Sequence, residues 1–235
     1  WKKRNVNEKR TKIKRREYDA AKKVNKFIAI SNSSKSYIKQ YYARDADVIY
    51  CPIDLDKFMP SSCKEDYFLL VSRLERWKML DYAIEAFNKL GYQLRIVGDG
   101  PDAERLKAIA EPNIHFTGVV DDESLAVEYS KARAVIFTPF IEYGLIPLEA
   151  AASGTPVICY GYGGVQETML PAQTDRGPAG GATAVFFFEQ NKMALLDAVK
   201  RFEQLEFDAD ALVMHAKKWG VPSFKRRIRE VVDMS

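Results

Sequence analysis

Short apolar runs alternate with helical patterns along most of the chain. From Phe27 onward, runs rich in β-branched and aromatic residues are separated by segments whose apolar residues recur at helical spacing. This alternation is typical of βα units around a parallel sheet that is covered on both faces. The sequence therefore predicts a doubly wound, Rossmann-like α/β fold, with strands at Phe27–Ile30, Val48–Cys51, Tyr67–Arg73, Gln93–Val97, Asn113–Thr117, Ala134–Thr138, Pro156–Cys159 and Ala184–Phe187.

Helices are expected between these strands. The strongest pattern covers Met79–Leu90, where one face is apolar and Gly91 follows as a stop signal. The sequence predicts further helices at Asp102–Ala110, Ser124–Ser130, Leu145–Ser153, Lys192–Glu206 and Ser223–Val232.

A proline-containing segment divides the chain. Residues 54–64 show neither strand nor helix periodicity and are predicted to be a linker. Residues 65–222 then form one α/β domain, and residues 223–235 form a terminal helix. Residues 1–53 hold too few strands for a sheet covered on both faces, so we expect them to be the tail of a second domain whose remainder is missing from this chain.

Composition and charge narrow the class of protein. The 235 residues are 47% hydrophobic and 29% charged, which excludes a disordered or low-complexity chain. No run approaches the roughly 18 apolar residues of a membrane-spanning helix. The three cysteines lack metal-site spacing, so we expect no zinc site and a reducing, cytoplasmic compartment. The net charge of +4 divides into +9 over residues 1–26 and −5 over the rest.

Two loops at predicted strand ends carry candidate ligand-binding residues. The first contains Arg73 and Lys78, two cations suited to phosphate oxygens, although a solvated structural role is equally compatible with the sequence. The second contains Gly98, Gly100 and Pro101, where the glycines permit close backbone approach and a plain tight turn is an equal alternative.

A third loop leads from the predicted strand ending at Thr138 into a helix. Gly144 opens this helix, and Glu149 lies about one turn inside it. Free N–H groups at a helix start favour a diphosphate, and a carboxylate nearby can accept hydrogen bonds from sugar hydroxyls. The alternative is an ordinary exposed glutamate in a first helical turn.

The three loops, in this order, resemble the donor half of the GT-B glycosyltransferases. The similarity is to the large retaining group, family 4, which includes bacterial O-antigen mannosyltransferases, and it covers roughly residues 27–235. The matching segments are Ser72–Leu74, Lys78, Asp81–Phe87, Gly98–Pro101, Phe116–Gly118, Glu142–Ala150, Gly154–Val157 and Gly163–Thr168.

The resemblance implies a role for each matching residue. Arg73 and Lys78 would bind the donor diphosphate, the backbone at Gly144 and Leu145 would bind its phosphates, and Gly98 would be a further substrate-binding residue. Glu149 would bind the nucleotide ribose, and the segment at Val119 would contact the base. The donor would be a nucleotide-activated hexose, with GDP-mannose as the first guess, and neither a cofactor nor a metal is implied.

One departure from the family pattern concerns the hexose. The family usually carries a glutamate eight positions before the match to Glu149, and this chain has Ile141 there. The neighbouring Glu142 is the candidate replacement, and we count it with Arg73 and Lys78 as a catalytic candidate. The position directly after Lys78 is often basic in this family, and this chain has Met79 there. The alternative function is therefore a non-catalytic nucleotide-sugar-binding or assembly subunit that needs a separate acceptor domain.

The acceptor and the cellular site follow from the resemblance and from the charge. We expect a glycan or lipid-linked acceptor, bound mostly by an acceptor domain or a separate subunit. The basic residues 1–26 suit an anionic surface, and we expect peripheral association with the inner face of a membrane rather than nucleic-acid binding. Asp54 and Asp56 spell a metal-binding DxD signature of another glycosyltransferase fold, but they lie in the linker, so we assign them no metal.

Overall fold

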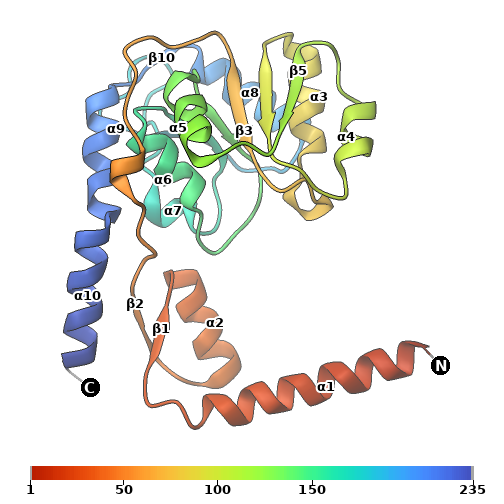
Figure 1. Ribbon diagram of the computed structural model, residues 1–235, viewed down its shortest axis with the longest axis vertical. Coiled ribbons are helices and arrows are strands. Elements are labelled where there is room, and N and C mark those ends of the chain that lie inside the picture. The colour runs from red at the N-terminus through yellow and green to blue at the C-terminus, as the bar shows by residue number, and fades with distance from the viewer. Residues whose placement is uncertain (1, 234–235) are drawn as a thin grey trace.

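The computed structural model describes residues 2–233, with side chains from residue 9 onward. The chain forms two parts joined by a narrow waist (Figure 1). The larger part, the sheet domain, comprises residues 65–219 and is built around a six-stranded sheet. The smaller part, the N-terminal unit, comprises residues 2–53 and is flanked by the last helix (Figure 1).

The central sheet is parallel throughout and has the strand order β5-β4-β3-β6-β7-β9. Its strands are almost wholly apolar and most of their residues are buried, as expected where helices cover both faces. This confirms the predicted doubly wound α/β fold. The strands are β3 (Phe68–Val71), β4 (Leu94–Val97), β5 (Ile114–Gly118), β6 (Val135–Phe137), β7 (Val157–Tyr160) and β9 (Ala184–Phe187).

Two layers of helices cover the sheet, each with its own apolar cluster. On one face Phe68, Phe87 and Phe202 lie at the centre of a cluster supplied by α3 (Asp81–Leu90), α4 (Ala103–Ala108) and α8 (Lys192–Phe202). On the other face the cluster is supplied by α5 (Asp122–Lys131), α6 (Leu145–Ala152), α7 (Val165–Thr168) and α9 (Ala209–Ala216). A minor parallel pair, β8 (Gly177–Pro178) and β10 (Leu205–Glu206), lies outside the main sheet.

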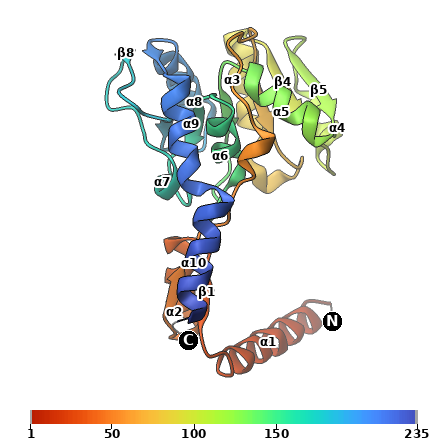
Figure 2. The same ribbon diagram turned by 60° about the vertical axis from the view of Figure 1, so that its left-hand side comes forward.

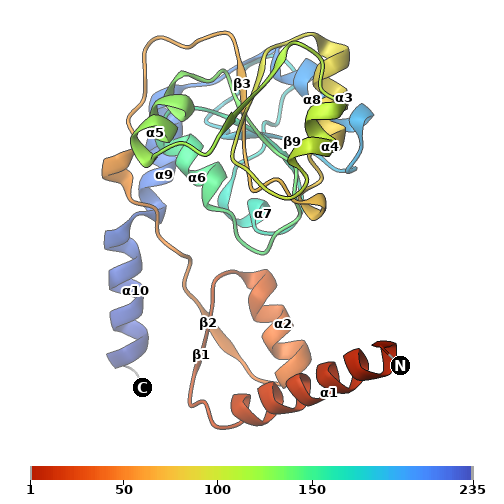
Figure 3. The same ribbon diagram turned by 45° about the vertical axis from the view of Figure 1, so that its right-hand side comes forward.

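The N-terminal unit contains a two-stranded parallel sheet with one helix between its strands. The elements are α1 (Lys2–Ala21), β1 (Phe27–Ala29), α2 (Asn32–Tyr42) and β2 (Ala46–Val48). Ser31 caps α2, since its hydroxyl accepts from the Ser34 N–H at 3.0 Å. Helix α1 extends away from the rest of the molecule (Figure 3), and its residues 9–20 are exposed.

The chain passes between the two parts twice, side by side. The descending segment contains the short 3₁₀ helix η1 (Leu55–Lys57), and the returning segment contains η3 (Lys217–Trp219) followed by α10 (Val221–Asp233). The Ile53 N–H donates to the Trp219 carbonyl at 3.0 Å, which joins the two segments. Helix α10 then runs beside the N-terminal unit (Figure 2), where Lys26 Nζ donates to the Val231 carbonyl at 3.5 Å.

Most predicted elements differ from the structure by one or two residues at an end, and two of them differ by more. The strand predicted at Val48–Cys51 lies at Ala46–Val48, because Pro52 restricts the residue before it and Cys51 already belongs to the crossing segment. The helix predicted over Lys192–Glu206 ends at Phe202, because the Gln204 carbonyl accepts from Gly177 N–H at 2.7 Å and the chain enters β10. In the described part of the chain, no helix is long and apolar enough to cross a membrane.

Candidate active site

The site lies where the strand order reverses. From β3 the chain runs outward through β4 to β5, and then returns to β6 on the other side of β3. The loops that leave the carboxyl ends of β3 and β6 therefore diverge, and ligands of open α/β sheets bind in the crevice between such loops. These two loops are residues 72–80 and 138–144.

The loop after β3 carries both candidate cations. Arg73 is 72% exposed and pairs with Glu75 at 3.4 Å, while Lys78 Nζ lies 4.1 Å from the centre of the Trp77 ring. Partial burial lowers the pKa of Lys78, and the nearby charge of Arg73 lowers it further. The two cations are thus close enough to repel each other, which favours an anion between them.

Thr138 joins the loop after β3 to the loop after β6. Its hydroxyl donates to the Lys78 carbonyl at 2.7 Å, and its own carbonyl accepts from Tyr82 Oη and Gln190 Nε2, each at 3.0 Å. Thr138 is almost wholly buried. The backbone that carries Lys78 is therefore fixed against the carboxyl end of β6.

The loop after β6 ends in the start of α6. Gly144 is its N-cap, and no side chain caps the helix. A Cβ atom at Gly144 would lie 3.1 Å from side-chain atoms of both Ile141 and Phe137, so the close packing favours glycine. Leu145 follows with 40% of its surface exposed. The uncapped N–H groups and the helix dipole favour a bound anion at this end.

Glu149 lies one turn further along α6, in the wall of a pocket of about 200 Å³. Its carboxylate accepts from Tyr129 Oη at 2.9 Å, and burial raises the pKa of Glu149. At the rim, Lys57 of the crossing segment pairs with Asp122 at 2.7 Å. The pocket is lined by Pro52, Ile53, Asp54, Lys57, Phe58, Asp122, Leu125, Leu145 and Glu149.

Gly98 and Val119 lie on neighbouring strand ends. Gly98 has φ +128°, and a Cβ there would lie 2.0 Å from the Ser72 carbonyl oxygen, so this glycine lets the two loops pack together. Its N–H donates to the Gly118 carbonyl at 2.8 Å. Val119 is 78% exposed at the open end of β5. Gly98 is thus a packing position, whereas Val119 is free to meet a ligand.

Ile141 and Glu142 differ in their surroundings. Ile141 packs against the apolar cluster on the α6 face of the sheet, whereas Glu142 is exposed and its carboxylate has no partner among the described residues. The Gly164 N–H donates to the Ile141 carbonyl at 2.9 Å, and a Cβ at Gly163 would lie 2.4 Å from the same oxygen. The loop after β7 therefore holds this backbone in place.

The structure adds three site residues that the sequence did not single out. Tyr129 and Thr138 gave no signal, because each acts through a contact with a distant segment. Glu167 lies inside the motif Gly163–Thr168 and binds the N-terminal unit. Within the described residues, no group of three or more His, Cys, Asp or Glu side chains is placed to hold a metal ion.

This geometry is that of a doubly wound α/β domain whose candidate site lies where the strand order reverses, and comparison with known proteins identifies its family. Residues 53–219 match the family model described as "Glycosyl transferases group 1". The chain belongs to this family.

The curated relatives are glycosyltransferases. An uncharacterised glycosyltransferase of Methanocaldococcus jannaschii is 28% identical over 63% of this chain and 44% of its own length. Glycogen synthase of Mycobacterium tuberculosis is 35% identical over 50% of this chain and 32% of its own. The O-antigen chain mannosyltransferase RfbU of Salmonella typhimurium is 30% identical over 59% and 43%, respectively. The matches thus span less than half of each of these relatives.

Solved structures share the fold. Sucrose-phosphate synthase from Thermosynechococcus elongatus superposes with a TM-score of 0.78 at 22% identity, over 93% of this chain and 60% of that chain. Anabaena HepE in complex with UDP-glucose gives 0.78 at 18% identity, over 94% and 67%. These are structures of the GT-B type.

Proposed function

We propose that the chain is the donor-binding half of a retaining hexosyltransferase that uses a nucleotide-activated sugar. The observation that carries this proposal is the hydrogen bond from Thr138 to the Lys78 carbonyl, which holds the cationic loop beside the loop that leads into α6. Solved neighbours of the same fold include complexes with UDP-glucose and with UDP and GlcNAc. GDP-mannose is the first donor to test, because one relative is named a mannosyltransferase.

The proposed chemistry uses the charges of the site. Glycosyl transfer passes through an oxocarbenium-like state while negative charge grows on the departing diphosphate. Arg73, Lys78 and the N–H groups around Gly144 and Leu145 stabilise that charge without reorganising, and loss of one such group costs on the order of 100-fold in rate. The donor is a substrate in this scheme, and the chain needs no cofactor or metal for it.

The remaining candidates bind the rest of the donor. Glu149 accepts hydrogen bonds from the ribose hydroxyls, since its carboxylate faces the pocket next to the helix start. Val119 contacts the base, because it is exposed at the end of the neighbouring strand. Glu142 faces the hexose with a free carboxylate.

A second candidate function rests on Ile141. An apolar side chain at this position cannot contact a hexose through hydrogen bonds, and here it packs into the core. The chain is then a nucleotide-sugar-binding or assembly subunit without transfer activity. Glu142→Gln separates the two functions: it abolishes transfer in an enzyme that uses Glu142, and it leaves nucleotide binding unchanged in either case.

The acceptor side is proposed to be incomplete in this chain. The N-terminal unit has two strands among its described residues, 2–53, and the solved neighbours extend well beyond the part that superposes. We assign residues 1–53 to the tail of an acceptor domain, 54–64 to the linker, 65–222 to the donor domain and 223–235 to the acceptor side; residues 1 and 234–235 lie outside the described residues. A further domain or a separate subunit supplies the remaining contacts to a glycan or lipid-linked acceptor.

Helix α1 is the proposed contact with an anionic membrane surface on the cytoplasmic side. Residues 1–26 carry twelve basic and three acidic residues, and residues 9–20 are exposed. Basic segments bind anionic lipids with a gain of about 1 kcal/mol per cation near the surface. Sedimentation with vesicles containing phosphatidylserine should show binding that salt abolishes. Absence of binding at low salt would refute the membrane role.

The proposed function is tested by calorimetric titration with GDP, UDP, ADP and their sugars. One nucleoside diphosphate should bind, and Arg73→Ala should lower its affinity by about 10- to 100-fold, as expected for loss of a charged hydrogen bond to phosphate. Lys200→Ala is the matched control, because Lys200 is exposed on α8, outside both site loops. Failure of every nucleotide to bind, or equal binding by Arg73→Ala, would refute the site.

A further inference from the structure

A single carboxylate joins the sheet domain to the N-terminal unit. Glu167 of α7 accepts four hydrogen bonds from the N-terminal unit. One oxygen accepts from Asn32 N–H at 2.8 Å, Asn32 Nδ2 at 2.8 Å and Tyr50 Oη at 2.9 Å, and the other accepts from Ser33 N–H at 3.2 Å. We call Asn32, Ser33, Tyr50 and Glu167 the inter-unit contact.

Glu167 acts as a cap for α2 from outside the N-terminal unit. The first N–H groups of a helix lack partners within the helix. The Ser31 hydroxyl accepts from the N–H of Ser34, and the Glu167 carboxylate accepts from the N–H groups of the two preceding residues, Asn32 and Ser33. The negative charge also interacts favourably with the positive end of the helix dipole. Separation of the two parts would therefore expose two unpaired N–H groups as well as the carboxylate.

Tyr50 adds an aromatic component to the same contact. Its ring packs edge-on against Trp219 at 4.8 Å between centres, and it lies 5.9 Å from the Tyr143 ring. Burial, followed by the hydrogen bond to Glu167, raises the pKa of Tyr50 to about 12, so the hydroxyl remains a donor. Tyr143 in turn donates to the Cys51 carbonyl at 2.7 Å.

The inter-unit contact is mechanically connected to the loop that carries Glu142. Helix α7 follows directly on Gly163 and Gly164, whose backbones pack on residues 141 and 142 too closely for any side chain. Tyr143 lies on the same loop and contacts the N-terminal unit directly. These contacts therefore set the position of the N-terminal unit relative to the loop after β6.

We infer that Glu167 is a positioning residue, which fixes the orientation of the N-terminal unit relative to the loop after β6. The chain crosses between the two parts only through two adjacent segments, joined at Ile53 and Trp219, and such a crossing permits rotation. Four hydrogen bonds to one carboxylate remove that freedom. The consequence for transfer, a fixed entry for the acceptor beside Glu142, rests on the proposed function. The orientation itself does not.

The orientation is measured with spin labels on the two parts of the full chain. Cysteines replace Gln40 on α2 and Lys200 on α8, both exposed, in a background with Cys51→Ser and Cys63→Ser. Double electron–electron resonance then gives the distribution of distances between the labels. A narrow distribution is expected for the parent protein.

Two variants of Glu167 test the role of the carboxylate. Glu167→Gln keeps the size and shape of the side chain but replaces one acceptor oxygen by an amide group that donates, facing other donors. Glu167→Ala removes the carboxylate altogether. Both should broaden the distance distribution, and the amides of Asn32 and Ser33 should exchange about 10- to 100-fold faster, as expected for lost charge-assisted hydrogen bonds. Glu206→Gln is the matched control, because Glu206 is exposed on β10 and should change neither measurement.

Either of two results would overturn the inference. One is a narrow, unshifted distribution in folded Glu167→Ala. The other is a Glu167→Gln protein that matches the parent in both measurements. Thermal unfolding of each variant shows that it is folded before labelling. The measurements use no ligand, so a protein that fails to bind any nucleotide would refute the proposed function while leaving the orientation result intact.

Discussion

Gly98→Ala tests whether the β3 and β4 loops must pack backbone to backbone. An added Cβ would lie 2.0 Å from the Ser72 carbonyl oxygen, although real Cβ contacts rarely fall below 3.0 Å. The loop that carries Arg73 must therefore move by about 1 Å. Overpacking of this kind costs about 1–3 kcal/mol. The positive φ of +128° adds about 1–2 kcal/mol for a residue with a side chain.

Gly91→Ala provides the matched control for backbone strain. Gly91 has φ +75°, but an added Cβ would meet nothing within 4 Å. It should cost only the strain, about 1–2 kcal/mol. Urea unfolding should therefore find Gly98→Ala less stable than Gly91→Ala by about 1–3 kcal/mol. The displaced loop should also weaken binding of the nucleotide diphosphate, whereas Gly91→Ala should leave binding unchanged.

Equal stability of the two alanine variants would refute the packing argument. Equal nucleotide affinity, in a Gly98→Ala protein that is measurably destabilised, would show that displacement of the loop does not reach Arg73. Each result is read from a difference between two variants that both place alanine at a positive φ. The comparison therefore does not depend on an absolute stability.

Three further variants test other parts of the site and fold. Tyr129→Phe leaves the buried Glu149 carboxylate without its donor, so it should cost about 1–3 kcal/mol in a urea melt. Burial raises the pKa of Glu149, so nucleotide affinity should fall as the pH falls through that raised pKa. In Tyr129→Phe the pKa should be higher again, because the hydrogen bond that lowers it is lost, and the affinity should therefore fall at a higher pH. Lys78→Met should reduce diphosphate affinity about 10- to 100-fold in calorimetry, with Lys89→Met unchanged. Arg95→Ala should cost about 1–2 kcal/mol without affecting nucleotide binding.

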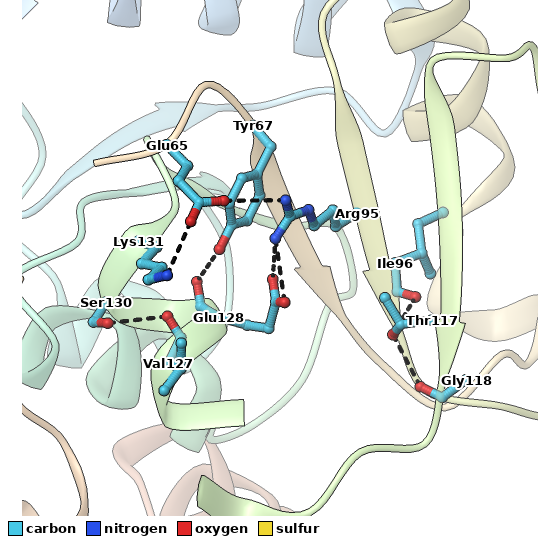
Figure 4. Close-up of polar contacts among 10 residues, drawn as sticks. All are labelled: Glu65, Tyr67, Arg95, Ile96, Thr117, Gly118, Val127, Glu128, Ser130 and Lys131. Atoms are coloured by element: carbon cyan, nitrogen blue, oxygen red, sulfur yellow. Dashed lines mark hydrogen bonds and ion pairs between the residues drawn. The ribbon is translucent and has the colours of Figure 1, made fainter. Parts of the chain in front are cut away.

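The Arg95 prediction rests on a cluster at the α5 face of the sheet (Figure 4). The guanidinium pairs with Glu65 at 3.1 Å and Glu128 at 3.2 Å, and it lies 3.8 Å from the centre of the Tyr67 ring. Tyr67 Oη donates to the Glu128 carbonyl at 2.9 Å, and Lys131 pairs with Glu65 at 3.0 Å. The cluster ties β3, β4 and α5 together. Its charged side chains are partly exposed, so solvent screening keeps the expected loss small.

The sign of the Glu149 effect follows from its two protonation states. A raised pKa means that the folded protein favours the protonated carboxyl. The carboxylate form, which is proposed to accept the ribose hydroxyls, is then lost at a pH above that at which an ordinary glutamate is protonated. Stability should change in the opposite direction. The contribution of Glu149 is fully present below its unfolded pKa and is lost as pH rises through the folded value.

The sequence predicted the sheet well because burial on both faces leaves a local mark. Most strands of the main sheet are runs of apolar residues, and each strand was predicted within a few residues of its observed bounds. The errors occurred where a distant segment decides the local structure. Helix α8 stops short of its predicted end because the Gln204 carbonyl accepts a hydrogen bond from the Gly177 N–H of β8. Cys51 lies outside β2 because the chain there crosses to the sheet domain, where Tyr143 binds its carbonyl.

The positions of the candidate site residues in the fold were predicted in part for the same reason. Arg73, Lys78 and Glu149 lie at strand ends and at a helix start, which sequence patterns mark. Their supporting contacts join residues far apart in the chain: Thr138 acts on Lys78 across 60 positions, and Glu167 on Asn32 across 135. No spacing rule connects such pairs. The sequence therefore gave no sign that Glu167 binds the N-terminal unit.

The surroundings of Ile141 explain how this chain departs from its family without losing its loop. The Gly164 N–H donates to the Ile141 carbonyl, and both glycines pack closely against the carbonyls of residues 141 and 142, so these backbone contacts hold the loop whatever the side chain at 141. Isoleucine there gains apolar burial, worth up to about 1.5–3 kcal/mol for a fully buried side chain. The polar side chain that the family usually carries at this position is absent in exchange. Glu142 lies on the same fixed backbone with an exposed carboxylate, and it is the group proposed to replace the missing one.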